Sequence, residues 1–277
     1  MARVIEAPAG PAFFPARKVT FERLRRFKWP AVRLLSVLLV LGLWEVFAQS
    51  GQVSRFLLPT FSSVLERLAD NAMSGILFEN TAFTIYRALA GFAIAAVLGV
   101  AIGLGMHASR IVHWFLDPII SVIFPMPKIA FLPIFVLWLG VFDASKIFMV
   151  VVDAILPVIA ATLVGIRGVD RQLIWSARNM GASERRILWD VILPAAFPAI
   201  MTGLQVALPI AIVVEIATEM LTGGRGLGGA MLESSRNADS PETFAGIVAV
   251  AVVGFVLVKG AAMLRRRLLR WHAEGQA

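Results

Sequence analysis

The segment DRQLIWSARNMGASERRILWDVILPAAFP, residues 170–198, decides how this chain is organised, because it is charged and lies between long apolar runs. Asp170 is expected to cap a first short helix, and Gly181 to end it in the left-handed conformation that helix ends favour. The apolar positions of this helix recur at helical spacing: Leu173, Ile174, Ala177 and Met180.

A second short helix is expected to follow. Ser183 can cap it, and Glu184 lies in its first turn, where the helix dipole favours negative charge. Pro194 and Pro198 are expected to end it before the next apolar run. Its apolar residues face one way: Ile187, Leu188, Val191 and Ile192. A compact amphipathic pair of helices of this kind suits docking to a soluble partner.

The composition indicates a membrane protein. Of 277 residues, 58% are hydrophobic, and the mean hydropathy of +0.80 is too apolar for a soluble domain of this length. Because about 20 apolar residues cross a bilayer core, we predict an all-α protein with six transmembrane helices, at about 31–49, 82–106, 117–141, 146–166, 197–221 and 243–264. The predicted organisation is a basic tail over 1–30, one transmembrane domain over 31–271 containing the loop 167–196, and a short tail over 272–277.

Basic residues predict the orientation. Lys and Arg are concentrated in the N-terminal tail, in the loop 167–196 and at the C-terminal end, whereas the opposite loops carry five: Arg55, Arg67, Lys146, Arg225 and Arg236. By the positive-inside rule, both termini and the loop 167–196 are cytoplasmic, in a multi-pass protein of a bacterial inner membrane. The net charge of +8 therefore reflects topology, and it favours membrane lipid headgroups as partners and not nucleic acid.

No catalytic or cofactor-binding pattern is recognisable in the sequence. The chain has no cysteine, and its three histidines form no zinc-ligand pattern. The glycine-rich stretch TGGRGLGG, residues 222–229, lacks the Lys-Ser/Thr ending of a phosphate-binding loop, so we expect a flexible outer loop there. We therefore expect a non-enzymatic subunit without cofactor or metal. The first apolar run could be read as a signal peptide, but Trp44 and Glu45 fit a cleavage site poorly, so we expect a retained helix.

The segment 170–198 is similar to the EAA loop of ABC importer permeases, which has the pattern E-A-A-x3-G-x9-I-x-L-P. The residues on this spacing are Ala177, Gly181, Val191, Leu193 and Pro194. The sequence departs from the pattern at Trp175 and Ser176, which stand where the family has Glu and the first Ala. From about Leu58 to Trp271, further stretches resemble the nitrate/sulfonate/taurine branch: Leu58–Thr60, Arg87–Phe92, Pro125–Pro127, Leu132–Phe135, Phe244–Ile247 and Arg265–Arg267.

The resemblance implies a type I ABC importer permease (MetI-like) fold. In that family the loop carries a coupling helix that docks into a cytoplasmic ABC ATPase subunit, and a periplasmic or lipid-anchored binding protein delivers the solute. For this chain it implies a homodimer that transports a small anionic solute, such as a sulfonate, taurine or nitrate. The implied ATPase-coupling residues are Leu173, Trp175, Ser176, Ala177, Met180, Gly181, Ala182, Ser183, Leu193 and Pro194.

Five polar residues inside the apolar runs are candidates for the transport pathway or its gate: Lys128, Asp153, Gln205, Glu215 and Glu219. Lys128 falls in a proline-rich run that predicts a broken helix, where it either lines an aqueous path, meets a carboxylate or reaches a membrane interface. The three residues of the fifth run share one helix face. They either line the route or form hydrogen bonds with a neighbouring helix.

Two further features concern the second run and the segment before it. Small residues at every fourth position, Gly91, Ala95, Gly99 and Gly103, predict close helix packing. Arg87 either anchors this run at the headgroups or attracts an anionic substrate. Ahead of the run, Ser63 with Glu66 forms a capping box for a short helix on the outer surface, which either contacts a delivering protein or covers the bundle.

The alternative to a permease is an ion-coupled secondary carrier or channel. In that case Asp153 and Glu215 would be ion or proton sites. This alternative leaves the amphipathic segment 170–198 without a role.

Overall fold

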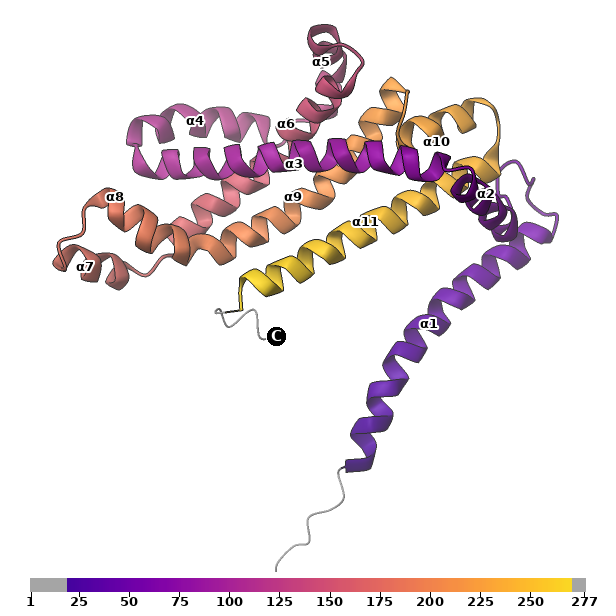
Figure 1. Ribbon diagram of the computed structural model, residues 1–277, viewed down its shortest axis with the longest axis horizontal. Coiled ribbons are helices and arrows are strands. Elements are labelled where there is room, and N and C mark those ends of the chain that lie inside the picture. Colours follow the sequence, from indigo (N-terminus) through magenta and orange to yellow (C-terminus); the bar gives the residue numbers. More distant parts are fainter. Residues whose placement is uncertain (1–18, 271–277) are drawn as a thin grey trace, which may run out of the picture. The chain divides into compact units, whose positions relative to one another are not determined.

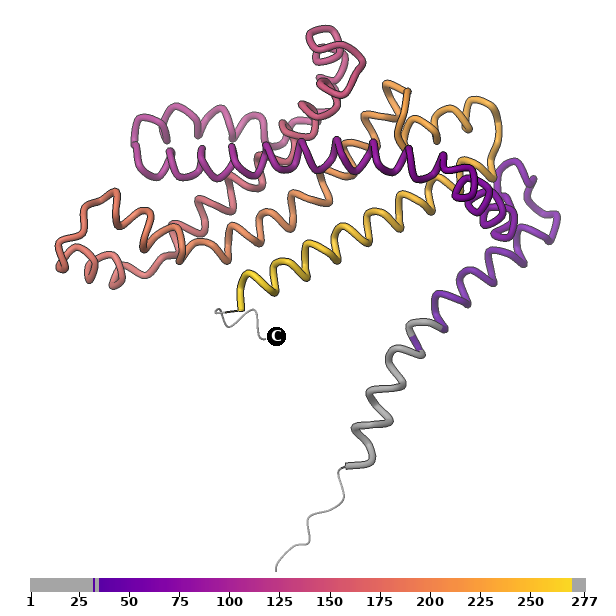
Figure 2. The backbone as a smooth tube through the Cα atoms, viewed as in Figure 1, coloured from indigo at the N-terminus to yellow at the C-terminus, as the bar shows by residue number. Residues whose placement is uncertain are grey.

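The computed structural model describes residues 19–270, which are helical apart from short connections (Figure 1). Of the predicted tails, residues 1–18 and 272–277 lie outside the described residues. The chain divides into two compact units, Met1–Val53 and Ser54–Ala277, and Figure 2 follows the backbone through each. The first unit contains α1 (Val19–Gln49), whose apolar stretch Leu35–Gln49 is shorter than a full membrane span.

The second unit contains the remaining elements. Its long helices are α3 (Ile76–Ala108), α6 (Asp143–Arg167), α9 (Leu193–Thr222) and α11 (Ser240–Leu268). The shorter elements are α2 (Phe61–Met73), α4 (Arg110–Ile123), the 3-10 helix η1 (Lys128–Phe131), α5 (Leu132–Leu139), α7 (Arg171–Asn179), α8 (Glu184–Ile187), the π-helical turn η2 (Leu188–Ile192) and α10 (Leu227–Arg236).

Four helical segments are long and apolar enough to cross a membrane: α3, α6, Glu184–Thr222 and α11. The pair Arg110–Ile123 and Lys128–Leu139 gives a fifth span if the two are counted together, although they are bent by 94°. The protein is therefore all-helical, with four to five candidate spans among the described residues. The break between α4 and η1 confirms the broken helix that the prolines of the third run predict.

The core of the second unit is the contact of α3, α6 and α9, and it depends on small residues. A Cβ atom on Gly99 would lie 2.7 Å from Cβ of Val158, and one on Gly91 would lie 2.6 Å from Cβ of Val150. These distances are too short for any side chain, so the glycines allow α3 to touch α6 directly. The prediction of a packing role for this stripe of small residues is confirmed.

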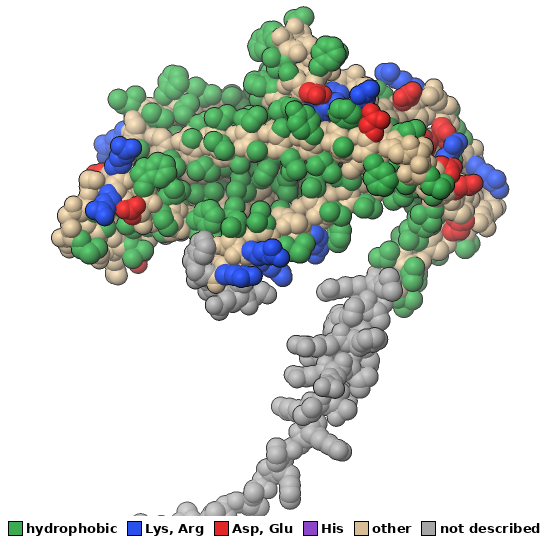
Figure 3. Space-filling view, viewed as in Figure 1, with side chains coloured by type: hydrophobic (Ala, Val, Ile, Leu, Met, Phe, Trp, Pro, Cys, Tyr) green, Lys and Arg blue, Asp and Glu red, His purple; other side chains and the backbone are tan. Residues whose placement is uncertain are grey.

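The surface of the second unit is strongly apolar. In Figure 3, apolar side chains cover the face between the two ends of the bundle, and most charged side chains gather toward those ends. Several large side chains are more than two-thirds exposed, including Trp114 at 78%, Leu137 at 82% and Trp138 at 70%. A surface of this composition suits lipid or neighbouring transmembrane helices.

Three local predictions are wrong. The helix that begins at α8 does not end at Pro194 or Pro198 but continues through the π-helical turn into α9, because local π adjustments of the backbone hydrogen bonds allow proline inside an apolar membrane helix. Thr60 caps α2 through the Ser63 amide, three residues earlier than the predicted cap. Lys146 was predicted in a loop, but it lies in the first turn of α6 and is 2% exposed.

Candidate functional site

At one end of the second unit, α7 and α8 form a short helical hairpin (Figure 1). Asp170 caps α7, because its Oδ1 accepts a hydrogen bond of 2.8 Å from the Gln172 amide. Ser183 caps α8 through the Arg186 amide, at 3.4 Å. Both predicted caps are confirmed.

Only some of the apolar side chains of the hairpin hold it to the bundle. Ala177, Ile187 and Ile192 are buried in a cluster with Ile166 and Val169 at the end of α6. Among the other residues of the hairpin that the EAA resemblance singles out, Ala182 and Leu193 are half-buried, whereas Ser176, Ser183 and Pro194 are exposed.

The remaining apolar side chains point away from the bundle. Leu173 is 51% exposed, Trp175 58% and Met180 81%. The predicted apolar face of the first helix is therefore divided, with Ala177 packed inward and Leu173 and Met180 free. Exposed apolar surface of this kind is typical of a site of interaction with a protein or a membrane.

The turn of the hairpin depends on Gly181 and on one ion pair. Gly181 has φ +82°, and a Cβ atom there would meet nothing within 4 Å. Across this turn Arg178 binds Glu184 through two parallel hydrogen bonds, from Nε at 2.9 Å and from Nη2 at 3.0 Å. The hydrogen bonds to Glu184 raise the pKa of the Arg178 guanidinium. The pair fixes α7 against the start of α8.

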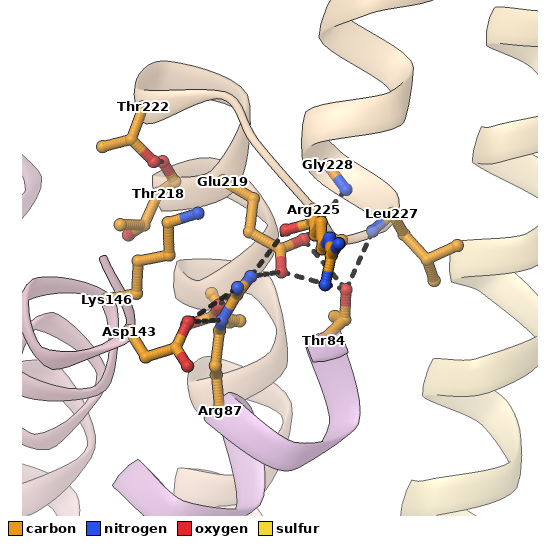
Figure 4. Close-up of polar contacts among 12 residues, drawn as sticks. Thr84, Arg87, Asp143, Lys146, Thr218, Glu219, Thr222, Arg225, Leu227 and Gly228 are labelled. Atoms are coloured by element: carbon orange, nitrogen blue, oxygen red, sulfur yellow. Dashed lines mark hydrogen bonds and ion pairs between the residues drawn. The ribbon is translucent and has the colours of Figure 1, made fainter. Parts of the chain in front are cut away.

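At the opposite end of the bundle, α3, α6 and α9 hold a buried cluster of charged side chains beneath the 223–226 loop (Figure 4). Arg87 lies at its centre and is 4% exposed. Its Nη1 donates to Glu219 Oε1 at 2.8 Å and to the Arg225 carbonyl at 2.6 Å, and its Nε donates to Asp143 Oδ1 at 2.8 Å. Arg87 therefore binds α6, α9 and the loop at once.

Glu219 is fully buried and has donors on both oxygens. The Thr84 hydroxyl donates to Oε2 at 2.9 Å, and so does the Gly228 amide, also at 2.9 Å. Thr84 in turn accepts from the Leu227 amide at 2.9 Å. The first amides of α10 are thus satisfied by α3 and α9, which attaches α10 to the bundle.

The 223–226 loop fits over Glu219 because the residue that lies closest to the carboxylate, Gly226, has no side chain. Gly226 has φ +123°, and a Cβ atom on it would overlap the Glu219 carboxylate. Lys146 donates to the Gly223 carbonyl at 2.9 Å, and Asn80 accepts from the Gly226 amide at 3.0 Å. The sequence TGGRGLGG is therefore an ordered cover over a buried carboxylate, where a flexible loop was expected.

Glu215 is the exception in this cluster. It is fully buried one turn before Glu219, yet neither carboxylate oxygen has a hydrogen-bond partner among the described residues. The nearest cation is Arg87, whose Nη1 lies 4.0 Å from Glu215 Oε1.

The other three pathway candidates lie elsewhere. Lys128, 9% exposed, lies at the break after α4, where its Nζ is 3.1 Å from Asp153 Oδ1 and donates to the Met126 carbonyl at 3.3 Å. Of the outcomes expected for Lys128, the contact with a carboxylate is the one observed. Gln205 accepts from Arg265 of α11 at 3.0 Å.

Sequence reasoning did not identify Arg87, Lys146, Thr84 and Asp143 as members of one site. Arg87 was expected at the headgroups or facing a substrate, but it is buried against acids. One signal was available: an arginine inside an apolar helix needs a buried partner, and Glu215 and Glu219 on another apolar helix are that partner.

Ionisable side chains buried at one end of a bundle of apolar helices are typical of functional sites in membrane proteins. Comparison with known proteins gives the family. The chain belongs to the family described as "Binding-protein-dependent transport system inner membrane component", which matches residues 91–270. Members of this family are non-catalytic membrane subunits of ABC transporters.

Two relatives extend over nearly the whole chain. The taurine transport system permease protein TauC of Escherichia coli (strain K12) is 32% identical over 92% of this chain and 96% of its own length. A putative aliphatic sulfonates transport permease protein, SsuC of Bacillus subtilis (strain 168), is 33% identical over 90% of each. Among solved structures, an inward-facing MetNI methionine ABC transporter matches with TM-score 0.60 at 16% identity, over 67% of this chain and 92% of its own. This last likeness concerns the fold alone.

Proposed function

We propose that this chain is the permease subunit of an ABC importer for taurine or related small aliphatic sulfonates. One observation carries the choice of solute: the two relatives named for taurine and aliphatic sulfonates match along about nine-tenths of this chain. The alternative of an ion-coupled carrier is not supported, since members of the family depend on a binding protein.

Six spans and a cytoplasmic hairpin follow from the same proposal. The sixth span is α1, and α4 with α5 forms one interrupted span. The excess of Lys and Arg before α1, around α7 and α8 and after α11 assigns both termini and the hairpin to the cytoplasm. The buried cluster then lies near the periplasmic side.

The hairpin is the proposed contact for the ATPase. Leu173, Trp175 and Met180 offer exposed apolar surface to a cleft on that subunit, and Gly181 sets the angle of the hairpin. Ser176, Ala177, Ala182, Ser183, Leu193 and Pro194 support this surface from within the hairpin or at its border. Because Ala177 and Ile187 pack against the end of α6, movement of the hairpin is passed to the bundle.

A second copy of the chain and an external binding protein complete the proposed importer. The exposed apolar surface of the bundle supports contact with lipid and with a second permease. Beside the 223–226 loop, a cavity of about 510 Å³ is lined by Arg225, Glu233 and Arg236, which gives the periplasmic end a polar surface for the binding protein. Lys128, Asp153, Gln205, Glu215 and Glu219 are assigned to the pathway or its gate.

Reconstitution tests the function. The purified permease is expected to form a complex with an ATPase subunit and, with the binding protein outside and ATP inside proteoliposomes, to take up labelled taurine. Nitrate and an unrelated amino acid serve as competitors. Uptake of taurine by the permease alone, driven by an ion gradient and without ATP, would contradict the proposal.

A further inference from the structure

We propose that Arg87 exchanges between two carboxylates, Glu219 when the 223–226 loop is closed and Glu215 when the loop is released, and that this exchange is a step of transport. The inference rests on the proposed function, because it assigns the buried cluster to the periplasmic end of an importer that opens alternately to each side. It makes Arg87, Thr84 and Lys146 positioning residues of that movement.

Glu215 is the observation that requires an explanation. A fully buried carboxylate without a hydrogen bond is costly, and such groups are rare in native proteins. The buried charges of the cluster are two acids, Glu215 and Glu219, and two cations, Arg87 and Lys146, with Asp143 half exposed at its edge. Lys146 donates to the Gly223 carbonyl and Arg87 lies closer to Glu219, so Glu215 has only a long ion pair of 4.0 Å and no hydrogen bond while the loop is closed.

The position of Glu215 suits a second partner for Arg87. The two glutamates are four residues apart on α9 and hence on the same face, about 6 Å apart along the axis. The same nitrogen, Nη1 of Arg87, lies 2.8 Å from Glu219 and 4.0 Å from Glu215. A change of side-chain rotamer or a small slide of α3 along α9 is enough to transfer the guanidinium.

Release of the loop removes the reasons for Arg87 to stay at Glu219. In the closed state the loop contributes the Arg225 carbonyl to Arg87, and α10, which follows the loop, contributes the Gly228 amide to Glu219. When the loop and the start of α10 lift, Glu219 becomes accessible to water, and water can replace the Gly228 amide as a donor to Glu219. Glu215, one turn deeper in the bundle, stays buried, so its need for a cation then exceeds that of Glu219.

The contacts that close the loop are polar, which suits a joint that must open repeatedly. The attraction within buried ion pairs is largely offset by the cost of removing the charges from water. Arg87, Thr84 and Lys146 therefore close the loop with contacts that can be broken at a small cost in free energy. Separating the apolar contact of α3 with α6 would cost more. Asp143, 44% exposed in its side chain, remains bound to Arg87 in either position.

The test replaces the idle carboxylate. Glu215→Met, with Glu215→Gln as a second variant, is expected to raise the melting temperature of the importer, because a buried carboxyl group without a hydrogen bond is removed. It is also expected to lower ATP-dependent taurine uptake at least tenfold, because Arg87 has no partner once the loop leaves. The matched control is Asp70→Met, which removes an exposed acid of α2 and leaves both quantities unchanged.

Loop opening is measured directly in the same complexes. Because the chain has no cysteine and Leu227, the first residue of α10 after the loop, is buried, Leu227→Cys gives a single thiol that a membrane-impermeant maleimide reaches when the loop and the start of α10 lift. Labelling is expected to accelerate during ATP turnover, and Glu215→Met is expected to suppress this acceleration about tenfold.

Two results would overturn the proposed exchange. The first is that Glu215→Met transports taurine as well as the unmodified protein does. The second is that ATP turnover does not change the labelling rate of Leu227→Cys. Failure of the unmodified permease to bind an ATPase subunit overturns the proposed function and, with it, the exchange. The two failures are therefore distinguishable.

Discussion

Replacing Gly181 with valine is expected to separate ATP hydrolysis from transport. Gly181 has φ +82°, and a non-glycine residue in the left-handed region costs about 1–2 kcal/mol, with β-branched residues disfavoured most. A Cβ atom there meets nothing within 4 Å, so no new contact offsets the strain. The turn is also restrained by backbone hydrogen bonds and by the exposed pair of Arg178 with Glu184, and an exposed pair contributes too little to offset the strain. The hairpin therefore relaxes to another angle.

The expected result is a protein that is inserted and stable but uncoupled. Ala177 and Ile187 still hold the hairpin to the bundle, so the melting temperature should fall by no more than a few degrees. Taurine uptake should fall at least tenfold, while the ATPase activity of the complex persists without stimulation by the binding protein. Both rates are measured on the same proteoliposomes.

Two controls isolate the backbone effect. Gly181→Asn should retain most transport, since asparagine tolerates the left-handed conformation. Gly254→Val places the same side chain in α11, where a Cβ atom also meets nothing within 4 Å, and should leave coupling unchanged. Normal stimulated transport by Gly181→Val would refute the assignment of the hairpin as the coupling element.

The other expectations concern stability and are read from thermal unfolding of the purified protein. Arg87→Ala should lower the free energy of unfolding by about 3–5 kcal/mol, because it leaves Glu219 buried without its cation. Arg67→Ala, which removes an exposed pair with Asp239, should lower it by less than about 1 kcal/mol. Equal losses in the two variants would contradict the argument from burial. Gly99→Val should cost about 1–3 kcal/mol by overpacking against Val158, and Val158→Ala in the same chain should recover part of it. If the two changes were additive, the close contact of α3 with α6 would be ruled out. Lys128→Met should destabilise the break after α4 by about 1–3 kcal/mol, and adding Asp153→Asn should recover part of this loss; no recovery would mean that the pair does not stabilise the break.

Much of this fold is predictable from sequence because apolar length and charge bias are strong signals. The caps at Asp170 and Ser183, the break at the third run and the small-residue stripe of α3 all follow from local chemistry. The continuation of α8 into α9 was not foreseen, because proline is a stop signal only where it removes a hydrogen bond that the helix needs.

The buried cluster was only partly predictable. Glu215 and Glu219 attract attention as acids on an apolar face, but their environment is set by α3 and by the 223–226 loop, which are distant in sequence. Local patterns do not show which helices meet. For the same reason Arg87 and Lys146, assigned to headgroups and to a loop, were found buried.

The accessibility of position 175 tests the central claim most directly. In the cysteine-free chain, Trp175→Cys places a single thiol on the exposed face of α7. The account predicts that a membrane-impermeant maleimide labels it in inverted membrane vesicles and not in intact spheroplasts, and that the bound ATPase subunit protects it. Labelling from the outside of spheroplasts, or labelling that the ATPase does not reduce, would contradict the account.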